Sequence, residues 1–228
     1  QLTYHRHAHW EAVELLREPL EGCKASMELV CNDLEMAGAA AFGAVHRLAQ
    51  ARELLDRAMR RTRAQPAERS RVVFAYAQLL TVEEAPGLGN LEEGRAYIDE
   101  YLASGQDCRS GARLLNQLGL QLATRGSVEA ATKAFAAADA LRAAKCPDDL
   151  AGINELHGMS IVLSWAEGAN PLREAFERKL AALRADTSQG PMPPGVRALL
   201  DAIELQARPP GDADKASDAK QLLETIHA

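Results

Sequence analysis

The stretch from Arg113 to Leu141 constrains the fold more than any other part of the chain, because it has the pattern of two helices joined by a tight turn. Apolar residues recur at helical spacing in its first half, and Gly126-Ser127 interrupts them. Glycine accepts the left-handed conformation that ends many helices, and a serine hydroxyl can accept from a free amide of the next helix. The sequence therefore predicts an αα-hairpin in which Gly119 allows close helix approach and Phe135 fills the space between the helices. The other packing positions are Leu115, Leu118, Leu122, Ala131 and Ala138.

The spacing of these packing positions recurs upstream in the chain. From Gly119 through Leu122, Ala131 and Phe135 to Ala138 the steps are 3, 9, 4 and 3 residues, and the same steps separate Ala39, Phe42, Ala51, Leu55 and Ala58. Residues 25–64 are therefore predicted to form another hairpin that turns near Gly43–His46. One unbroken helix over the same residues is the alternative. A separate helix is predicted over residues 4–18, ended by Pro19 and Gly22.

The central series of residues resembles the tetratricopeptide (TPR) repeat. That family's pattern is a large residue, Leu-Gly, a second large residue, a turn glycine and then Ala, Phe and Ala, spread over about 34 residues. The sequence departs from it with leucines in place of Trp and Tyr and with Ala143 in place of the closing proline. The resemblance implies an all-α fold of antiparallel helix-hairpin repeats stacked as a right-handed TPR-like α-solenoid. We expect one domain over residues 1–228, with candidate hairpins at 25–64, 69–104, 112–144 and 151–185 and C-terminal capping helices at 194–228.

Composition agrees with close-packed helices and narrows the class of function. Hydrophobic residues make up 47% of the chain but aromatic residues only 4%, and sheets draw on aromatic and β-branched residues. The net charge of -6 disfavours a dedicated nucleic-acid binder. Since no run of 18 apolar residues occurs, we expect no membrane span. The chain starts at Gln1 without a signal-like segment, so we interpret it as a piece of a longer protein and expect a cytoplasmic location.

The four cysteines carry no metal or redox motif, because none of them forms a CxxC pair. If Cys23 and Cys31 share one helix, their Cα atoms lie about 12 Å apart. A disulfide needs Cα atoms within about 7 Å. Cys108 and Cys146 each precede a predicted hairpin, and an approach between them across neighbouring hairpins stays open. We predict free thiols at all four positions.

No catalytic motif is recognisable in the sequence: it has no Walker loop, GxSxG elbow or HExxH helix. We therefore predict a non-enzymatic protein without a cofactor or a metal. His157 is interpreted as a packing residue inside a helix, and the alternation of His5, His7 and His9 as a frayed terminus rather than a metal site. Basic residues crowd one predicted helix end, where cations complement the helix dipole. We interpret them as a solvated helix end rather than an anion-binding patch; they are Arg57, Arg60, Arg61 and Arg63.

The TPR resemblance implies that the functional surface is the concave face lined by the first helix of each repeat. We predict a scaffold or adaptor that holds a protein or peptide in this groove, through apolar anchors and a few orienting hydrogen bonds. One alternative is a regulatory or sensor domain of a larger transcriptional or signalling protein, which would hold a small effector in an enclosed pocket. Another is an all-helical enzyme with an unrecognised motif. The predicted groove residues are Arg71, Phe74, Gln78, Arg113, Asn116, Leu120, Glu155 and Met159.

Overall fold

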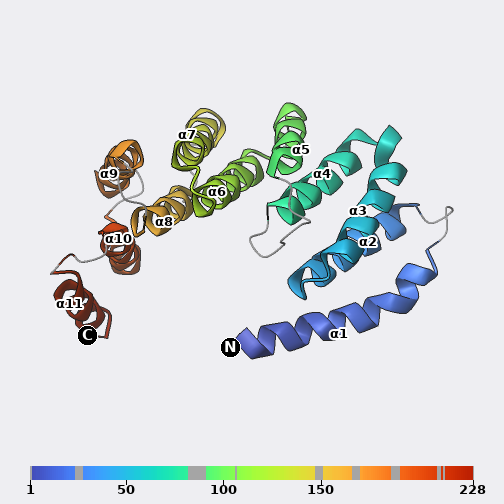
Figure 1. The fold of residues 1–228 in the computed structure, drawn as a ribbon, viewed down its shortest axis with the longest axis horizontal. Helices are drawn as coiled ribbons and strands as arrows, with labels where there is room; N and C mark the ends of the chain where they lie inside the picture. Colours follow the sequence, from blue (N-terminus) through green and yellow to red (C-terminus); the bar gives the residue numbers. More distant parts are fainter. Residues whose placement is uncertain are drawn as a thin grey trace. The chain divides into compact units, whose positions relative to one another are not determined.

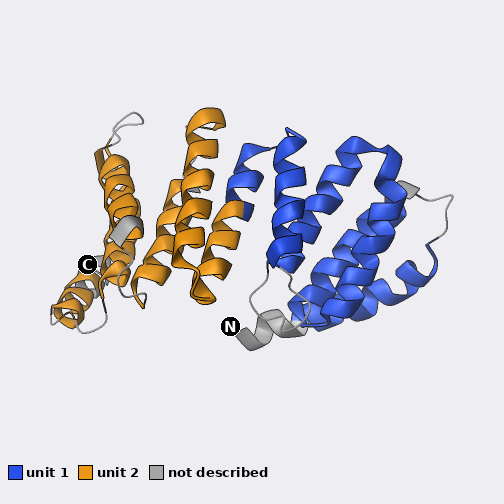
Figure 2. Ribbon diagram, turned by 45° about the horizontal axis from the view of Figure 1, so that its top comes forward, with its two compact units in different colours: residues 1–114 blue, residues 115–228 orange. Residues whose placement is uncertain are grey.

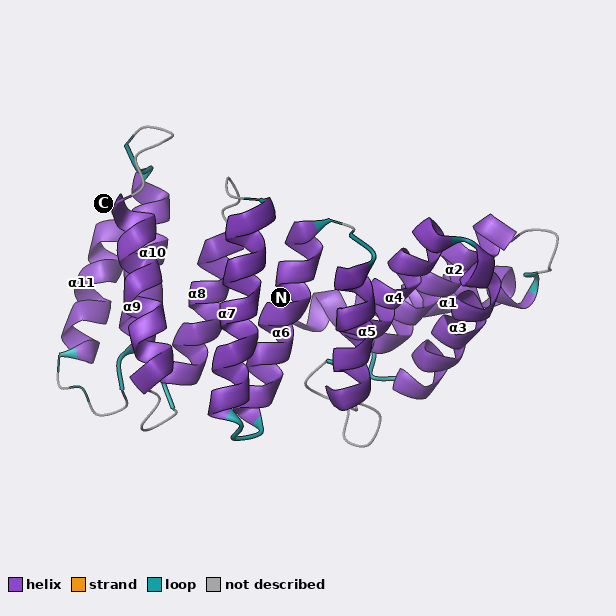
Figure 3. Ribbon diagram, turned by 90° about the horizontal axis from the view of Figure 1, so that it is seen from above, coloured by secondary structure: helices purple, strands orange, loops and turns teal. Residues whose placement is uncertain are grey.

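The computed structural model of the chain is helical, and no strand occurs among the residues that it describes (Figure 3). The backbone is described except at residues 1, 24–27, 82–90, 106, 147–150, 166–169, 186–190, 210, 211, 213 and 228, and the side chains of residues 2–7, 28, 29, 151, 154, 170, 171 and 223–227 are also outside the description. The all-α prediction is confirmed for this part of the chain. The helices are α1 (Leu2–Glu21), α2 (Glu28–Ala44), α3 (Leu48–Arg61), the short 3-10 helix η2 (Thr62–Ala64), α4 (Pro66–Leu80), α5 (Leu91–Ala103), α6 (Cys108–Thr124), α7 (Val128–Lys145), α8 (Ala151–Leu163), α9 (Asn170–Ala185), α10 (Pro194–Ala207) and α11 (Lys215–His227) (Figure 1).

The helices fall into two compact units, residues 1–114 and residues 115–228, which we describe separately (Figure 2). In the first unit, α2 packs against α1, α3 and α4, and α4 packs against α5. In the second unit, α8 packs against α7, α9 and α10, and α11 packs against α10. In these pairs, most helices that follow one another in the sequence also lie side by side in space. The single domain and its solenoid stacking stay predictions.

The central turn has the predicted glycine but lacks the predicted serine cap. Gly126 has a φ of +81°, in the left-handed region, and its N–H donates to the carbonyl of Ala123. Ser127 is the N-cap residue of α7, yet its side chain makes no capping hydrogen bond. Its ψ of 61° lies outside the β region that typical N-caps adopt, so the hydroxyl is not placed over the first turn. That part of the prediction is wrong.

Residues 25–64 contain two helices, and the alternative of one unbroken helix is wrong. α2 ends at Ala44 and α3 begins at Leu48. His46, between them, has a φ of 61°, a conformation that breaks a helix and that few residues other than glycine adopt. The N–H of Arg47 donates to the carbonyl of Phe42 and closes the turn.

Pro19 does not end α1, contrary to the prediction, because the helix continues to Glu21. Tertiary packing accounts for the extra residues. Leu20 is buried, and its side chain lies where a Cβ on Gly38 of α2 would be only 2.9 Å away. The last turn of α1 is therefore held by apolar contacts with α2 after proline has removed a backbone hydrogen bond.

The predicted packing inside the central hairpin is present in the second unit. Phe135 is fully buried, and a Cβ added to Gly119 would lie 2.9–3.0 Å from its ring. Gly158 of α8 comes almost as close to the same ring, at 3.2 Å. Two glycines thus let α6 and α8 approach the aromatic side chain of α7, as expected at Gly119 from the sequence.

A pair of stacked tyrosines, one buried and one partly buried, packs in the core of the first unit. Tyr76 of α4 is fully buried and stacks on Tyr97 of α5, with ring centroids 4.6 Å apart. Its hydroxyl donates to Oδ1 of Asp56 on α3 at 2.5 Å. Burial, followed by the hydrogen bond to this carboxylate, raises the pKa of Tyr76 well above its ordinary value.

The raised pKa of Tyr76 predicts a loss of stability in alkaline solution. An unfolded tyrosine ionises near pH 10, whereas the folded protein keeps the Tyr76 proton at higher pH. The contribution of Tyr76 to the free energy of unfolding is therefore complete below about pH 10 and decreases as the pH rises above this value. We expect the free energy of urea unfolding to fall above about pH 10 and to fall less steeply in the Tyr76→Phe variant. If the free energy of unfolding fell equally steeply with pH in the wild type and the variant, ionisation of Tyr76 would not be the cause.

Candidate functional site

A pocket of about 310 Å³ in the first unit brings together residues from four helices. Its apolar part comes from α2, α4 and α5, and its polar part from α4 and the start of α6. We name it the α4 pocket, because α4 contributes four of its residues. The lining residues are Met36, Ser70, Arg71, Phe74, Ala75, Tyr101 and Ser110.

Two aromatic rings form one side of the α4 pocket. Phe74 and Tyr101 lie with their ring centroids 5.4 Å apart and their planes inclined by 50°. The interaction between two rings tilted in this way stabilises their positions in addition to the stabilisation from burial. Burial also raises the pKa of the Tyr101 phenol, which a hydrogen bond with Ser110 partly offsets. The aromatic side is therefore rigid and neutral at physiological pH.

Arg71 is held at the exposed edge of the α4 pocket by two carboxylates. Its Nη2 donates to Asp33 on α2 at 2.9 Å, and its Nη1 donates to Glu68 on the preceding turn of α4 at 2.8 Å. The Arg71 side chain is 54% exposed, and ion pairs of this kind contribute at most about 1 kcal/mol each. Their main effect is to orient the guanidinium, which remains in contact with solvent.

The start of α6 next to this pocket is capped by Asp107. Its carboxylate accepts hydrogen bonds from the backbone N–H groups of Arg109 and Ser110 and from the Ser110 hydroxyl. The hydroxyl bond is the largest cause of the lowered pKa of Asp107. The cap fixes Ser110, which thereby presents a defined polar group to the pocket.

The predicted groove residues of the first unit partly converge. Arg71 and Phe74 both line the α4 pocket. Gln78 lies one turn further along α4 and is half-buried, and Arg113 on α6 is exposed. Neither of these two lines the pocket. The role of all four in binding stays a prediction.

Two of the predicted groove residues in the second unit are buried. Asn116 and Leu120 are half-buried on α6, but Glu155 and Met159 on α8 are each only 2% exposed. Because α7, α9 and α10 all pack against α8, the face of α8 that carries these two residues is covered and not open to solvent as a groove would be. Met159 belongs to the apolar core there, and an exposed groove position is wrong for both residues.

Glu155 is the centre of a buried ion network between three helices. Its carboxylate accepts from Arg142 Nε of α7 at 3.1 Å and contacts Lys179 Nζ of α9 at 2.5 Å. Asp139 of α7 contacts the same two cations from the other side and is half exposed. Loss of either cation would leave this buried carboxylate with less compensation for its charge. The sequence pattern gave no sign of the network, because its members lie on different helices.

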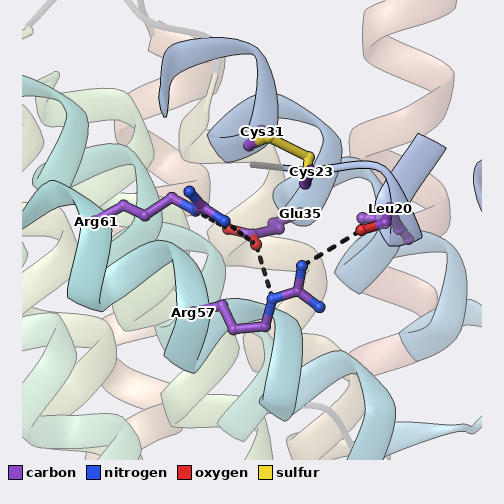
Figure 4. Close-up of a disulfide and its surroundings, with 6 residues drawn as sticks. All are labelled: Leu20, Cys23, Cys31, Glu35, Arg57 and Arg61. Carbon is purple, nitrogen blue, oxygen red and sulfur yellow. Dashed lines mark hydrogen bonds and ion pairs between the residues drawn. A yellow bond between two sulfur atoms is a disulfide. The ribbon is translucent and has the colours of Figure 1, made fainter. Parts of the chain in front are cut away.

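A second buried carboxylate was also missed, in the first unit. Glu35 of α2 is fully buried and binds two arginines of α3, Arg57 at 2.9 Å and Arg61 at 3.1 Å (Figure 4). Arg57 also donates to the backbone carbonyl of Leu20 at the end of α1. These two arginines are therefore not a solvated helix end, as predicted, but connect α3 to α1 and α2. Glu35 lies four positions from Cys31 and from Ala39, which are both buried, so a charge on this helix face was the available signal.

The cysteines are oxidised, so the prediction of free thiols is wrong. Cys23 and Cys31 form a disulfide with their Cα atoms 5.5 Å apart (Figure 4). A separation of about 12 Å applies only within one shared helix, whereas Cys23 follows the end of α1 and Cys31 lies in α2. Cys108 and Cys146 are disulfide-bonded as well.

Removal of the first disulfide is expected to weaken the first unit. The Cys23→Ala/Cys31→Ala variant frees a closed loop with a sequence separation of 8, and the loop-entropy relation assigns about 2–3 kcal/mol to such a loop. Urea unfolding followed by far-UV circular dichroism measures the loss. The oxidised wild type serves as the comparison, because reducing buffer would also break the disulfide bonds of Cys108 and Cys146. An unchanged unfolding midpoint in the variant would show that the bond adds no stability.

The histidines have no metal site among the described side chains. No group of three or more His, Cys, Asp or Glu residues suitable for a metal ion occurs there. His9 is exposed, while the side chains of His5 and His7 lie outside the description. His157 is exposed on α8, so its interpretation as a packing residue is wrong. Within the described part of the chain, no helix is long and apolar enough to cross a membrane.

Comparison of the chain with protein-family models, with curated proteins and with solved structures finds no match.

Proposed function

We propose that the chain is a non-enzymatic binding module that holds a protein or peptide by seating one bulky apolar side chain in the α4 pocket. The observation that carries the proposal is the convergence of Arg71 and Phe74, two predicted groove residues, in one pocket with Met36 and Tyr101. As part of the proposal, the helix hairpins stack as a right-handed TPR-like α-solenoid. The pocket then lies on the face formed by the first helices of successive repeats.

The chemistry of the α4 pocket supports a peptide ligand. The side chains of Met36, Phe74 and Tyr101 form an apolar surface in the pocket. Methionine and aromatic side chains are frequent in peptide-binding grooves. Arg71 stands beside this surface and can donate to backbone carbonyls of an extended segment. The Ser110 hydroxyl donates its proton to Asp107, so it can accept from a backbone N–H of the segment. An apolar anchor with a few orienting hydrogen bonds is the arrangement expected from the sequence.

The disulfides support an oxidising compartment as the place of action, in contrast to the cytoplasmic location predicted from the sequence. All four cysteines are oxidised. Disulfides persist in secreted, periplasmic and lumenal proteins, whereas cytosolic thiols are kept reduced. Alkylation of free thiols during extraction from the native host tests this part of the proposal. Full labelling of all four cysteines would contradict it.

The peptide-binding proposal is tested with a peptide selected from a random display library on the immobilised full chain. Fluorescence anisotropy then gives its affinity for the wild type and for the Phe74→Ala variant. We expect a loss of about tenfold or more, because a central aromatic contact commonly contributes over 1 kcal/mol to binding.

The matched control is Trp165→Ala, which removes another partly exposed aromatic side chain in the second unit. It is expected to bind the selected peptide like the wild type. Failure to enrich any peptide would overturn the proposal. Equal affinities of the Phe74→Ala variant and the wild type would also overturn it.

A further inference from the structure

A second pocket lies against the buried ion network of the second unit. It has a volume of about 480 Å³, within the range of about 300–1,000 Å³ that is usual for small-molecule sites. Alanines of α7 and α9 form most of its apolar wall, together with Met159 and Leu183. Four charged residues complete the lining: Asp139, Arg142, Arg178 and Lys179. We name it the α7–α9 pocket.

Among the charged residues that line the α7–α9 pocket, cations outnumber carboxylates. Three cationic side chains and one carboxylate face it, and Glu155 lies beneath them as the buried partner of Arg142 and Lys179. Arg142 and Lys179 have side chains only 10% and 8% exposed. Charged groups with so little exposure interact more strongly with an added charge than surface groups do, because they are poorly screened.

Two of the cations retain donors for a ligand. An ammonium group has three N–H donors, and the contacts described for Lys179 are with two carboxylates, Asp139 and Glu155. Arg178 is 72% exposed and lies 3.9 Å from Glu174, a distance beyond that of a hydrogen bond. Its long side chain can therefore turn toward the pocket without breaking a buried contact.

Asp139 shows that the cations at the pocket wall bind an oxyanion. Its half-exposed carboxylate bridges Arg142 and Lys179 at the pocket wall. A ligand carboxylate or phosphate has the same acceptor oxygens and charge sign. Alanine side chains leave room beside it for the rest of a small molecule.

We propose that the α7–α9 pocket binds a small oxyanion-bearing molecule, a carboxylate or a phosphate. Lys179 and Arg178 donate to the oxyanion, and Asp139 opposes it as a neighbouring negative charge. This site lies in the second unit and is independent of the peptide-binding function proposed for the first. It gives the chain the capacity to respond to a small anionic effector.

The test is isothermal titration calorimetry of the full oxidised chain with sodium citrate and, separately, with sodium phosphate, both at an ionic strength held constant with sodium chloride. The citrate arm reports a carboxylate site and the phosphate arm a phosphate site. We expect saturable binding in at least one arm. Absence of saturable heat in both arms would overturn the proposal.

Three variants separate a ligand site from a purely structural ion network. Arg178→Gln leaves the buried contacts intact and is expected to lose about tenfold in affinity, whereas Arg125→Gln, an exposed arginine in the α6–α7 turn, keeps wild-type affinity. Asp139→Asn removes the competing charge and is expected to bind about tenfold more tightly. If Arg178→Gln titrates like the wild type, the proposal is wrong. The same conclusion follows if Asp139→Asn loses thermal stability without a gain in affinity.

Discussion

The Phe135→Asp variant is expected to unfold the second unit. Phe135 is fully buried, and its ring packs so closely against Gly119 and Gly158 that a Cβ on either glycine would lie 2.9–3.2 Å from it. Truncation of a buried phenylalanine alone removes about 3–5 kcal/mol. An aspartate adds the cost of a carboxylate without a partner in the apolar core. Because domains of this size are stable by about 5–15 kcal/mol, the combined loss is sufficient to unfold the unit.

Far-UV circular dichroism and urea unfolding measure this effect, with Ala137→Asp as the matched control. Ala137 lies on the exposed side of the same helix, so the control introduces the same charge without burial. We expect the control to unfold within about 0.5 kcal/mol of the wild type. A Phe135→Asp variant that retained the helical signal and a wild-type midpoint would show that this ring is not central to the core.

The Arg57→Ala/Arg61→Ala variant is expected to lose about 3–5 kcal/mol, because it leaves the Glu35 carboxylate buried without a cation. Glu35 is fully buried, whereas the arginine side chains are 31% and 20% exposed. The carboxylate is therefore shielded from water, whereas both guanidinium groups remain partly in contact with it. In Glu35→Gln the arginines can still reach water, and we expect a smaller loss of about 1–3 kcal/mol.

Urea unfolding of the two variants decides this asymmetry, and Arg60→Ala/Arg63→Ala provides the control. Arg60 and Arg63 are exposed at the same end of α3 and in η2, so their removal changes the net charge equally. We expect the control to remain within about 0.5 kcal/mol of the wild type. Equal losses for both arginine pairs would mean that the effect comes from net charge and not from Glu35.

The helices themselves were largely predictable, because their signals are local. The apolar spacing around Leu118 and Phe135 placed α6 and α7, and Gly126 placed the turn between them. Where a prediction of this kind was wrong, tertiary contacts were the reason. Leu20, packed between α1 and α2, extends α1 beyond Pro19.

The candidate sites were predictable only in part. Arg71 and Phe74 were found because both point away from the packing stripe of one helix. Glu155 was placed on the wrong face, because the number of helices that cover α8 cannot be read from the sequence of α8. The disulfide between Cys23 and Cys31 was not predicted, because both cysteines were assumed to lie in one helix. In the structure α1 ends before Cys23, and Cys31 lies in α2.

The sequence by itself determined that the chain is helical and where most helices begin and end, since both follow from apolar periodicity and turn residues within one segment. Only the tertiary structure decided which charges meet. Glu35 and Arg61 are 26 positions apart, and Asp139 and Lys179 are 40 apart. Such pairs form only when helices that are distant in the sequence pack side by side. Charged residues that look like ordinary surface residues in the sequence then become buried ion pairs or line the α7–α9 pocket.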